Sequence, residues 1–382
     1  MEKKKAIIAM SGGVDSSVSA FLMQQAGYEC IGATMKLFHN EDLKEEGEKE
    51  DKTCCSLNDV EDARAVAFRL GMPFYVFNFS ADFNHAVIDR FVEDYQKGRT
   101  PNPCIECNRC LKFEKLYRRM QELNMDFIVT GHYARISFDE ESGRWQLKKA
   151  VDSNKDQSYV LYMLTQEQLA HIIFPLGGMT KPEVRALAEE HGFINARKHD
   201  SQDICFVPDG DYAGFIERYT GTKPVPGNYV NPQGEVLGTH KGIIHYTIGQ
   251  RKGLGIALGA PAYVTDMNPE KNTVTLGTND QLFSRGLIAD QVNLISCASL
   301  AVPKRVSAKV RYRQTEQPAM AWQTEDGRLH VRFDEPQRAI TKGQAVVLYD
   351  GELVVGGGTI VELAEEEVPI EPNELAPSSV QP

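Results

Sequence analysis

Apolar and polar residues along the first half of the chain repeat with two different periods. Short, nearly continuous apolar runs predict buried strands, and segments with apolar residues every three or four positions predict helices. The runs are AIIAM (6–10), CIGATMKLF (30–38), FYVFNF (74–79) and DFIVTGHYA (126–134), and the clearest helical segments are 16–26 and 57–70. Strands alternating with helices are typical of a parallel sheet covered by helices on both faces, so we expect an α/β domain over residues 1–208.

The pattern changes after this domain. Residues 209–277 are rich in Gly and Pro and show few helical periods, which predicts a small, turn-rich connecting domain. Residues 278–364 alternate in the strand period, and Asp-Gly pairs at 326–327 and 350–351 are typical of hairpins, so a small β-barrel is expected there. The acidic, Pro-containing tail 365–382 has little to bury and is predicted to be disordered.

Charge and length limit the class of protein. The chain has 382 residues, 42% of them apolar, and no run approaches the ~20 apolar residues of a membrane span. We therefore expect a cytoplasmic, monomeric protein with no membrane partner. The formal net charge of −11 comes from two acidic segments, 41–51 and 362–374. The remainder is close to neutral, which leaves room for basic patches that bind a phosphate backbone.

Residues 10–17, MSGGVDSS, lie between the first predicted strand and the first predicted helix. Two glycines permit a tight turn, and the N–H groups of the turn and of the helix start then form a polyphosphate site. The lysine of a Walker A loop is absent. Serine hydroxyls are expected to act as donors instead, and Asp15 is expected to hold Mg²⁺ or to orient the loop.

The cysteines form a second motif. Cys104, Cys107 and Cys110 are each separated by two residues, and Cys205 follows about a hundred residues later in a polar, acidic segment. In a reducing compartment such clusters are more often metal ligands or reactive thiols than disulfides. By spacing alone, a zinc site made of these four cysteines remains an alternative to thiol chemistry.

SGGVDSS resembles the signature of the ATP pyrophosphatase (PP-loop) superfamily, whose members use ATP to adenylate a carbonyl oxygen and release pyrophosphate. Further motifs narrow the resemblance, over nearly the whole chain, to the bacterial tRNA-specific 2-thiouridylases (tRNA uridine 2-sulfurtransferases). These motifs are AMSGGVDSS, GRTPNPCIECNRCLKF, TGHYAR, DSNKDQSYVLY, SQDICF, HYTIGQRKGLGI and VRYRQ. The resemblance implies ATP-dependent conversion of the wobble uridine, U34 of tRNA, to 2-thiouridine, with AMP and pyrophosphate as the other products.

The resemblance also assigns residues. It implies that Cys107 is the nucleophile or acid and that Cys205 carries sulfur as a persulfide. Positions that match ATP contacts are Ala9, Met10, Ser11, Gly12, Gly13, Val14, Asp15, Ser16, Met35 and Gly131. Positions that match contacts with tRNA, the target base included, are Asn102, Pro103, Cys104, His132, Lys155, Asp156, Gln157, Arg311, Tyr312 and Gln344. The implied partners are tRNA and a persulfide-donating sulfur carrier or cysteine desulfurase, and the implied cofactors are ATP and Mg²⁺.

One departure from the family pattern leaves the sulfur chemistry open. Many members carry Asp where this chain has Cys104 and a residue other than cysteine where it has Cys110. Cys104, Cys107 and Cys205 are therefore compatible with an iron–sulfur cluster, with Cys110 as a fourth ligand or a bystander. We favour the persulfide relay and assign no metal ligand.

Basic residues cluster in the sequence near the predicted site. Those around the cysteine segment are Arg99, Arg109, Lys112, Lys115, Arg118 and Arg119, and those in the predicted barrel are Lys304, Arg305, Lys309, Arg311 and Arg313. Solvated charge on helix and strand faces is the alternative to phosphate contact. Two other functions also stay open: an amide-forming ATP pyrophosphatase, and a zinc-stabilised RNA-binding protein without catalytic activity.

Overall fold

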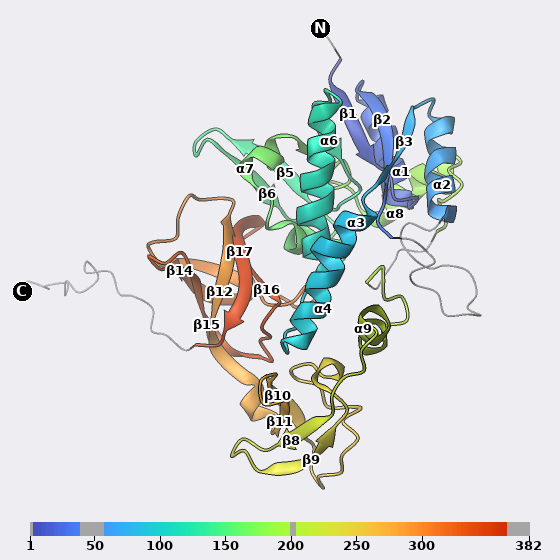
Figure 1. Ribbon diagram of the computed structural model, residues 1–382. Helices are drawn as coiled ribbons and strands as arrows, with labels where there is room; N and C mark the ends of the chain where they lie inside the picture. The colour runs from blue at the N-terminus through green and yellow to red at the C-terminus, as the bar shows by residue number, and fades with distance from the viewer. Residues whose placement is uncertain (1–2, 39–56, 199–203, 365–382) are drawn as a thin grey trace, which may run out of the picture.

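The computed structural model describes residues 3–38, 57–198 and 204–364, and Figure 1 shows a sheet-and-helix domain above a barrel and a small connecting domain. The acidic segment 41–51, Cys54, Cys55 and the tail 365–382 lie outside the described residues. Within the described ranges, no helix is both long and apolar enough to span a membrane.

The first domain contains a parallel sheet in the order β3-β2-β1-β4-β7. Its strands are β1 (Lys5–Ala9), β2 (Glu29–Lys36), β3 (Phe74–Asn78), β4 (Phe127–Val129) and β7 (Ile172–Ile173). Alternate residues of β1 face opposite sides, with Ile8 packed against α1, α2 and α8, and Ile7 packed against the helices that follow the cysteine segment. The predicted α/β class is confirmed.

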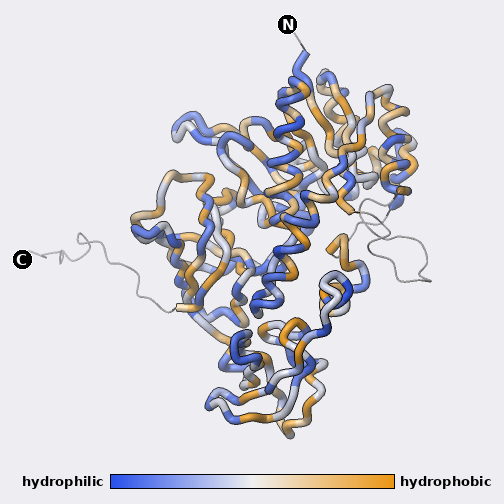
Figure 2. The backbone as a smooth tube through the Cα atoms, in the orientation of Figure 1, coloured by the Kyte–Doolittle hydropathy of each residue, from blue (hydrophilic) through white to orange (hydrophobic). Residues whose placement is uncertain are grey.

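Helices cover both faces of this sheet, with α1, α2 and α8 packed on one face and η3, α6 and α7 on the other. In chain order the helices of this domain begin with α1 (Val14–Gln25), α2 (Leu57–Arg69), α3 (Ser80–Phe83), η2 (Asn84–Ile88), α4 (Asp89–Gln96) and α5 (Pro103–Glu106). They continue with η3 (Cys107–Lys115), α6 (Leu116–Glu122), η4 (Ser158–Leu161), α7 (Gln166–Ala170) and α8 (Lys181–Glu190). Helix α9 (Tyr212–Thr220) follows this domain and contacts η5 of the connecting domain. The stretch from α4 to α6 alternates between polar and apolar segments (Figure 2), as expected for helices with one buried face.

The connecting domain has one four-stranded sheet in the order β10-β11-β8-β9. Its elements are β8 (Gly227–Val230), β9 (Val236–His240), η5 (Ile243–His245), β10 (Tyr263–Asn268) and β11 (Thr273–Gly277). A small core around Tyr229, Tyr246 and Val264 holds it together. This agrees with the predicted turn-rich domain.

The C-terminal strands form an antiparallel barrel that closes through β12–β17 pairing. Its elements are η6 (Asp280–Leu282), β12 (Phe283–Leu294), β13 (Lys304–Lys309), β14 (Gln317–Gln323), β15 (Leu329–Arg338), β16 (Ala345–Asp350) and β17 (Leu353–Glu362). The two Asp-Gly pairs lie at the β14–β15 and β16–β17 hairpins, as predicted. The barrel is therefore confirmed.

One pairing crosses the predicted domain boundaries. The hairpin of β5 (Arg135–Asp139) and β6 (Arg144–Lys148) comes from the first domain, yet β6 pairs with β17 and extends the barrel sheet. Sequence period alone shows where strands are and not which sheet they join. The exact boundaries 208, 277 and 364 stay predictions.

Candidate active site at the carboxyl edge of the parallel sheet

The phosphate loop connects β1 to α1 at the carboxyl edge of the sheet. Thr34 on β2 donates its hydroxyl to the carbonyl of Met10 at 2.7 Å, which fixes the loop entry. The hydroxyls of Ser16 and Ser17 both donate to the carbonyl of Gly13. Gly13 is the N-cap of α1, and no side chain of the described residues caps this helix. Its first N–H groups are therefore available to an anion.

Asp15 orients the loop. Its carboxylate accepts hydrogen bonds from Nζ of Lys181, at 2.8 Å to each oxygen, and from the hydroxyl of Tyr133 at 2.8 Å. Tyr133 and Lys181 are both buried, at 2% and 7% exposure. Of the two roles expected for Asp15, these contacts favour orientation of the loop over binding of Mg²⁺.

The other predicted ATP-contacting residues lie at the same edge. Gly131 follows β4, and a Cβ atom placed on it would come within 2.9 Å of the backbone of Asp15 and Ser16. Only glycine therefore allows the loop after β4 to approach the phosphate loop this closely. Met35, near the end of β2, is half-buried against two apolar clusters. Nucleotides bind at this edge of open parallel sheets, where connections leave neighbouring strands in opposite directions.

The cysteine segment begins a helix beside this edge. Asn102 caps α5 by accepting a hydrogen bond from the backbone N–H of Cys104 at 3.2 Å, and Pro103 occupies the first turn. The chain then continues as the π-helix η3, which starts at Cys107. π-Helical turns are rare and frequent at functional sites. Cys104 is exposed, whereas Cys107 and Cys110 are partly buried.

Cys107 and Cys205 pack against one apolar cluster. This cluster contains Leu37 and Phe38, which follow β2, and Phe79, which follows β3. Cys110 packs against it too. The two thiols, far apart in sequence, thus lie against the same apolar cluster as the residues that follow β2 and β3. Their joint role in sulfur transfer stays a prediction.

The sequence left a metal site at the cysteines open. Among the described residues, no three His, Cys, Asp or Glu side chains are grouped so as to hold a metal ion. The iron–sulfur cluster and the four-cysteine zinc site stay the alternatives to the persulfide relay, and no metal ligand is assigned.

The barrel holds the cysteine segment from the other side. The side-chain amide of Gln344 donates to the carbonyls of Thr100 and Pro101, at 2.7 and 3.3 Å. Tyr312 donates its hydroxyl to the carbonyl of Asp156 at 3.2 Å. Burial raises the pKa of Tyr312, and the nearby charges of Asp156 and Cys104 raise it further. The loop before β16 therefore contacts the residues that precede α5, and the loop after β13 contacts the segment that contains Asp156.

Known proteins resemble the chain along most of its length. Residues 4–209 match a family described as tRNA methyl transferase HUP domain, 213–278 its PRC-barrel domain, and 284–360 an aminomethyltransferase beta-barrel domain. A tRNA-specific 2-thiouridylase of Acetivibrio thermocellus is 52% identical over 94% of this chain and 100% of its own. The corresponding protein of Clostridioides difficile is 51% identical over 94% of this chain and 98% of its own. The chain belongs to the tRNA-specific 2-thiouridylase family.

Similarity to solved structures is weaker. A 4-thiouridine synthetase in complex with RNA and ATP aligns with 54% of this chain and 45% of its own, at 20% identity and a TM-score of 0.36. That value is too low to add to the family assignment.

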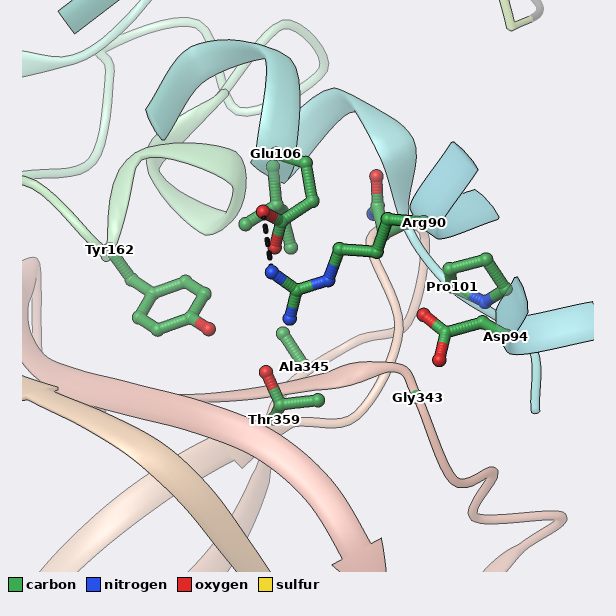
Figure 3. A pocket seen from close by; sticks show the side chains of 10 residues that line it. Arg90, Asp94, Pro101, Glu106, Tyr162, Gly343, Ala345 and Thr359 are labelled. Carbon is green, nitrogen blue, oxygen red and sulfur yellow. Dashed lines mark hydrogen bonds and ion pairs between the residues drawn. The ribbon is translucent and has the colours of Figure 1, made fainter. Parts of the chain in front are cut away.

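A pocket lies between the cysteine helix and the barrel. Figure 3 shows Arg90 reaching across it toward Glu106. The guanidinium of Arg90 donates to Glu106 and to Gln291 on β12, both at 3.0 Å. Glu106 directly precedes Cys107 and also pairs with Arg109. Arg90 thereby links the cysteine helix to the barrel, and the sequence motifs did not indicate this role.

Several predicted RNA-contacting residues support the fold in this conformation. His132 is 7% exposed, its ring lies against Phe113 and Phe174, and burial lowers its pKa well below the usual value. The carboxylate of Asp156 accepts from the backbone of Ala150 and from Ser158. The side chain of Gln157 accepts from the N–H of Tyr133. Their contact with tRNA remains a prediction, as does that of Lys155.

The basic residues are mostly neutralised by acids. The pairs are Arg99–Asp94, Arg109–Glu106, Lys115–Asp82, Arg118–Glu114, Arg119–Glu122, Lys304–Asp350 and Arg305–Asp334. Exposed pairs of this kind contribute little stability and can exchange partners. Phosphate contact by these residues stays a prediction.

Proposed function

We propose that the protein uses ATP to replace the C2 oxygen of the wobble uridine of tRNA by sulfur, giving 2-thiouridine, AMP and pyrophosphate. Two observations support this proposal. The chain is about half identical, end to end, to tRNA-specific 2-thiouridylases. In addition, Cys107 and Cys205 share an apolar cluster at the edge of the sheet that carries the phosphate loop.

ATP is needed because the C2 oxygen is a poor leaving group. Attack of this oxygen on the α-phosphorus forms the C2–O–AMP adduct and releases pyrophosphate. The N–H groups at the start of α1 and the turn at Gly12 and Gly13 are suited to bind the anionic phosphates. Asp15, held by Lys181 and Tyr133, keeps the turn in place.

Sulfur transfer then requires two thiols. A persulfide on Cys205, loaded by an external donor, attacks C2 with its terminal sulfur, the C2–O bond breaks, and AMP leaves. The Cys107 thiolate attacks the Cys205 sulfur, the S–S bond breaks, and 2-thiouridine is released with a Cys107–Cys205 disulfide. In the alternative order, Cys107 first releases sulfide from the persulfide, and this sulfide attacks C2. An external reductant restores both thiols.

The tRNA must present its base at this edge. A base reaches ATP and the thiols only when it is flipped out or lies in a loop, which an anticodon loop allows. Exposed Cys104 and Tyr312 flank the entrance, on the first domain and on the barrel. We infer that the nucleotide passes between these two domains.

The test combines unmodified tRNA, ATP, Mg²⁺ and, as the persulfide donor, a cysteine desulfurase with cysteine, with detection of 2-thiouridine by mass spectrometry and of released pyrophosphate. Cys107→Ser and Cys205→Ser should abolish thiolation, and Cys110→Ser, on the same helix, is the matched control. Thiolation that survives in Cys205→Ser would contradict the sulfur route. Absence of pyrophosphate release with tRNA would instead favour a non-catalytic RNA-binding protein.

A further inference from the structure

The phosphate loop carries no lysine of its own, although bound polyphosphate requires compensating charge. In P-loop proteins a lysine inside the motif meets this need. Two lysines from a distant part of the chain reach the loop here. Nζ of Lys181 donates to both carboxylate oxygens of Asp15. Lys198 contacts the loop at another point.

Lys198 lies directly beside the glycine turn. Its Nζ is 3.4 Å from the carbonyl oxygen of Gly12 and 2.6 Å from carboxylate oxygens of both Asp59 and Asp62. Burial would lower the pKa of Lys198, but hydrogen bonds and charges from the two acids outweigh it, so the pKa is raised. The ammonium group is thus charged and about one-third exposed.

Asp59 and Asn195 approach the glycine turn closely on the side where Lys198 lies. Gly12 has a φ of +75°, and a Cβ atom on it would lie 2.3 Å from the carbonyl oxygen of Asp59. Asn195 donates its amide to Gly12 and to Ser17, both at 2.9 Å. Asn195 is 3% exposed, and its Oδ1 has no hydrogen-bond partner among the described residues. A buried carbonyl oxygen without a donor is costly and indicates an absent partner, such as a bound water or ligand.

The local charge favours a divalent cation with the nucleotide. Among the described residues that contact one another beside Gly12, the carboxylates of Asp59 and Asp62 and the ammonium group of Lys198 sum to a charge of −1. That charge would repel a polyphosphate unless a cation lies between them. Mg²⁺ is commonly bound by one or two carboxylates together with substrate phosphates. Asp59 and Asp62, one helical turn apart on α2, offer such a pair.

We propose that Lys198 binds the β- and γ-phosphates of ATP and that Asp59 and Asp62 bind the accompanying Mg²⁺. Without nucleotide, the acids hold Lys198 beside Gly12. With nucleotide, the lysine exchanges a carboxylate partner for phosphate, and the carboxylate is released to the metal. This site deepens the proposed function and rests on its use of ATP.

The experiment measures binding to the full-length protein by titration calorimetry. The probes are α,β-methylene-ATP, which resists cleavage at the α–β bond, and AMP, each with and without Mg²⁺. Lys198→Met loses one charge-assisted contact with the phosphates, so it should bind the ATP analogue about 10–100-fold more weakly than the parent protein does. Its affinity for AMP should stay within about 3-fold of the parent value. Lys198→Arg, which keeps the charge, should recover part of the loss.

The metal role has its own readout. The parent protein should bind the ATP analogue more tightly with Mg²⁺ than without it. The ratio of these two affinities, the Mg²⁺ ratio, should fall toward one in Asp62→Asn. The matched control is Arg197→Met, which removes a neighbouring exposed cation paired with Glu189 and should leave all constants unchanged.

Three outcomes are informative. Equal weakening of AMP and of the ATP analogue in Lys198→Met would show that the lysine only ties α2 to the loop, and would overturn the proposal. An unchanged Mg²⁺ ratio in Asp62→Asn would overturn the metal assignment even if Lys198→Met failed to fold. If the parent protein bound neither nucleotide, the proposed use of ATP itself would be wrong.

Discussion

Replacing Lys181 by methionine tests how the phosphate loop is held. Methionine keeps the apolar stem and removes the ammonium group, so Asp15 retains only the hydroxyl of Tyr133. The lysine side chain is 9% exposed and that of Asp15 is 30% exposed. The pair is therefore buried on one side and partly solvated on the other.

The magnitude follows from this burial. Removing one partner of a fully buried ion pair costs about 3–5 kcal/mol, since the other charge remains without compensation. Water reaches Asp15, which reduces the loss to about 2–3 kcal/mol. For a domain of 150–250 residues this corresponds to a fall in melting temperature of about 4–12 °C. Nucleotide affinity should fall as well, because the loop loses its anchor.

The assay is thermal unfolding of a double-mutant cycle followed by circular dichroism. The Asp15→Asn background removes the carboxylate charge that the lysine ammonium contacts in the parent protein. In that background Lys181→Met should therefore lower the free energy of unfolding by at least about 1 kcal/mol less than it does in the parent protein. Arg197→Met removes an exposed cation paired with Glu189 of α8, and should change stability by less than about 0.5 kcal/mol.

The result that refutes the reasoning is additivity. If Lys181→Met lowered the melting temperature equally in both backgrounds, the 2.8 Å contacts would not represent an energetic coupling. A loss no larger than that of Arg197→Met would lead to the same conclusion.

Two further predictions concern the glycine turn and the cysteine helix. Gly12→Ala should abolish nucleotide binding in calorimetry because its Cβ meets the backbone of Asp59, whereas Gly27→Ala, also at positive φ but with open space around it, should bind normally; equal behaviour would disprove the steric role. Burial raises the pKa of Cys110, so its alkylation by iodoacetamide, followed by mass spectrometry, should be slow at neutral pH and should accelerate as the pH rises toward that pKa. Alkylation of Cys110 as fast as that of exposed Cys104 at neutral pH would contradict its burial.

Much of the fold was predictable because its signals are local. The continuous apolar run of β1 and the Asp-Gly pairs at 326–327 and 350–351 depend on adjacent residues, and the structure confirms the strands and hairpins they predict. The same reasoning failed to foresee that β5 and β6 extend the barrel sheet. Pairing between strands distant in sequence depends on tertiary packing, which a local period does not encode.

The residues of the candidate site also fall into those that local motifs indicate and those that only tertiary packing brings to the site. The glycine turn and the cysteine triplet are contiguous motifs, so their positions could be read from the sequence. Spacing left zinc binding and thiol chemistry open for the cysteines, and the family resemblance favoured the thiols. Lys181, Lys198 and Asn195 were missed, because each lies in a segment whose local pattern is that of an ordinary helix or turn. The absence of a lysine from the loop motif was the one available signal. It indicated that a cation from elsewhere in the chain is required, but it did not show which residue supplies it.

The sequence by itself determined the α/β class, the C-terminal barrel, the phosphate loop and the thiols, since each follows from neighbouring residues. Only the tertiary structure decided that Asp15 is held by Lys181, that Gly12 is contacted from Asn195 and Lys198, and that Cys107 and Cys205 share one apolar cluster. The physical reason is that these contacts join residues about 100–185 positions apart, and burial of the sheet faces brings them together.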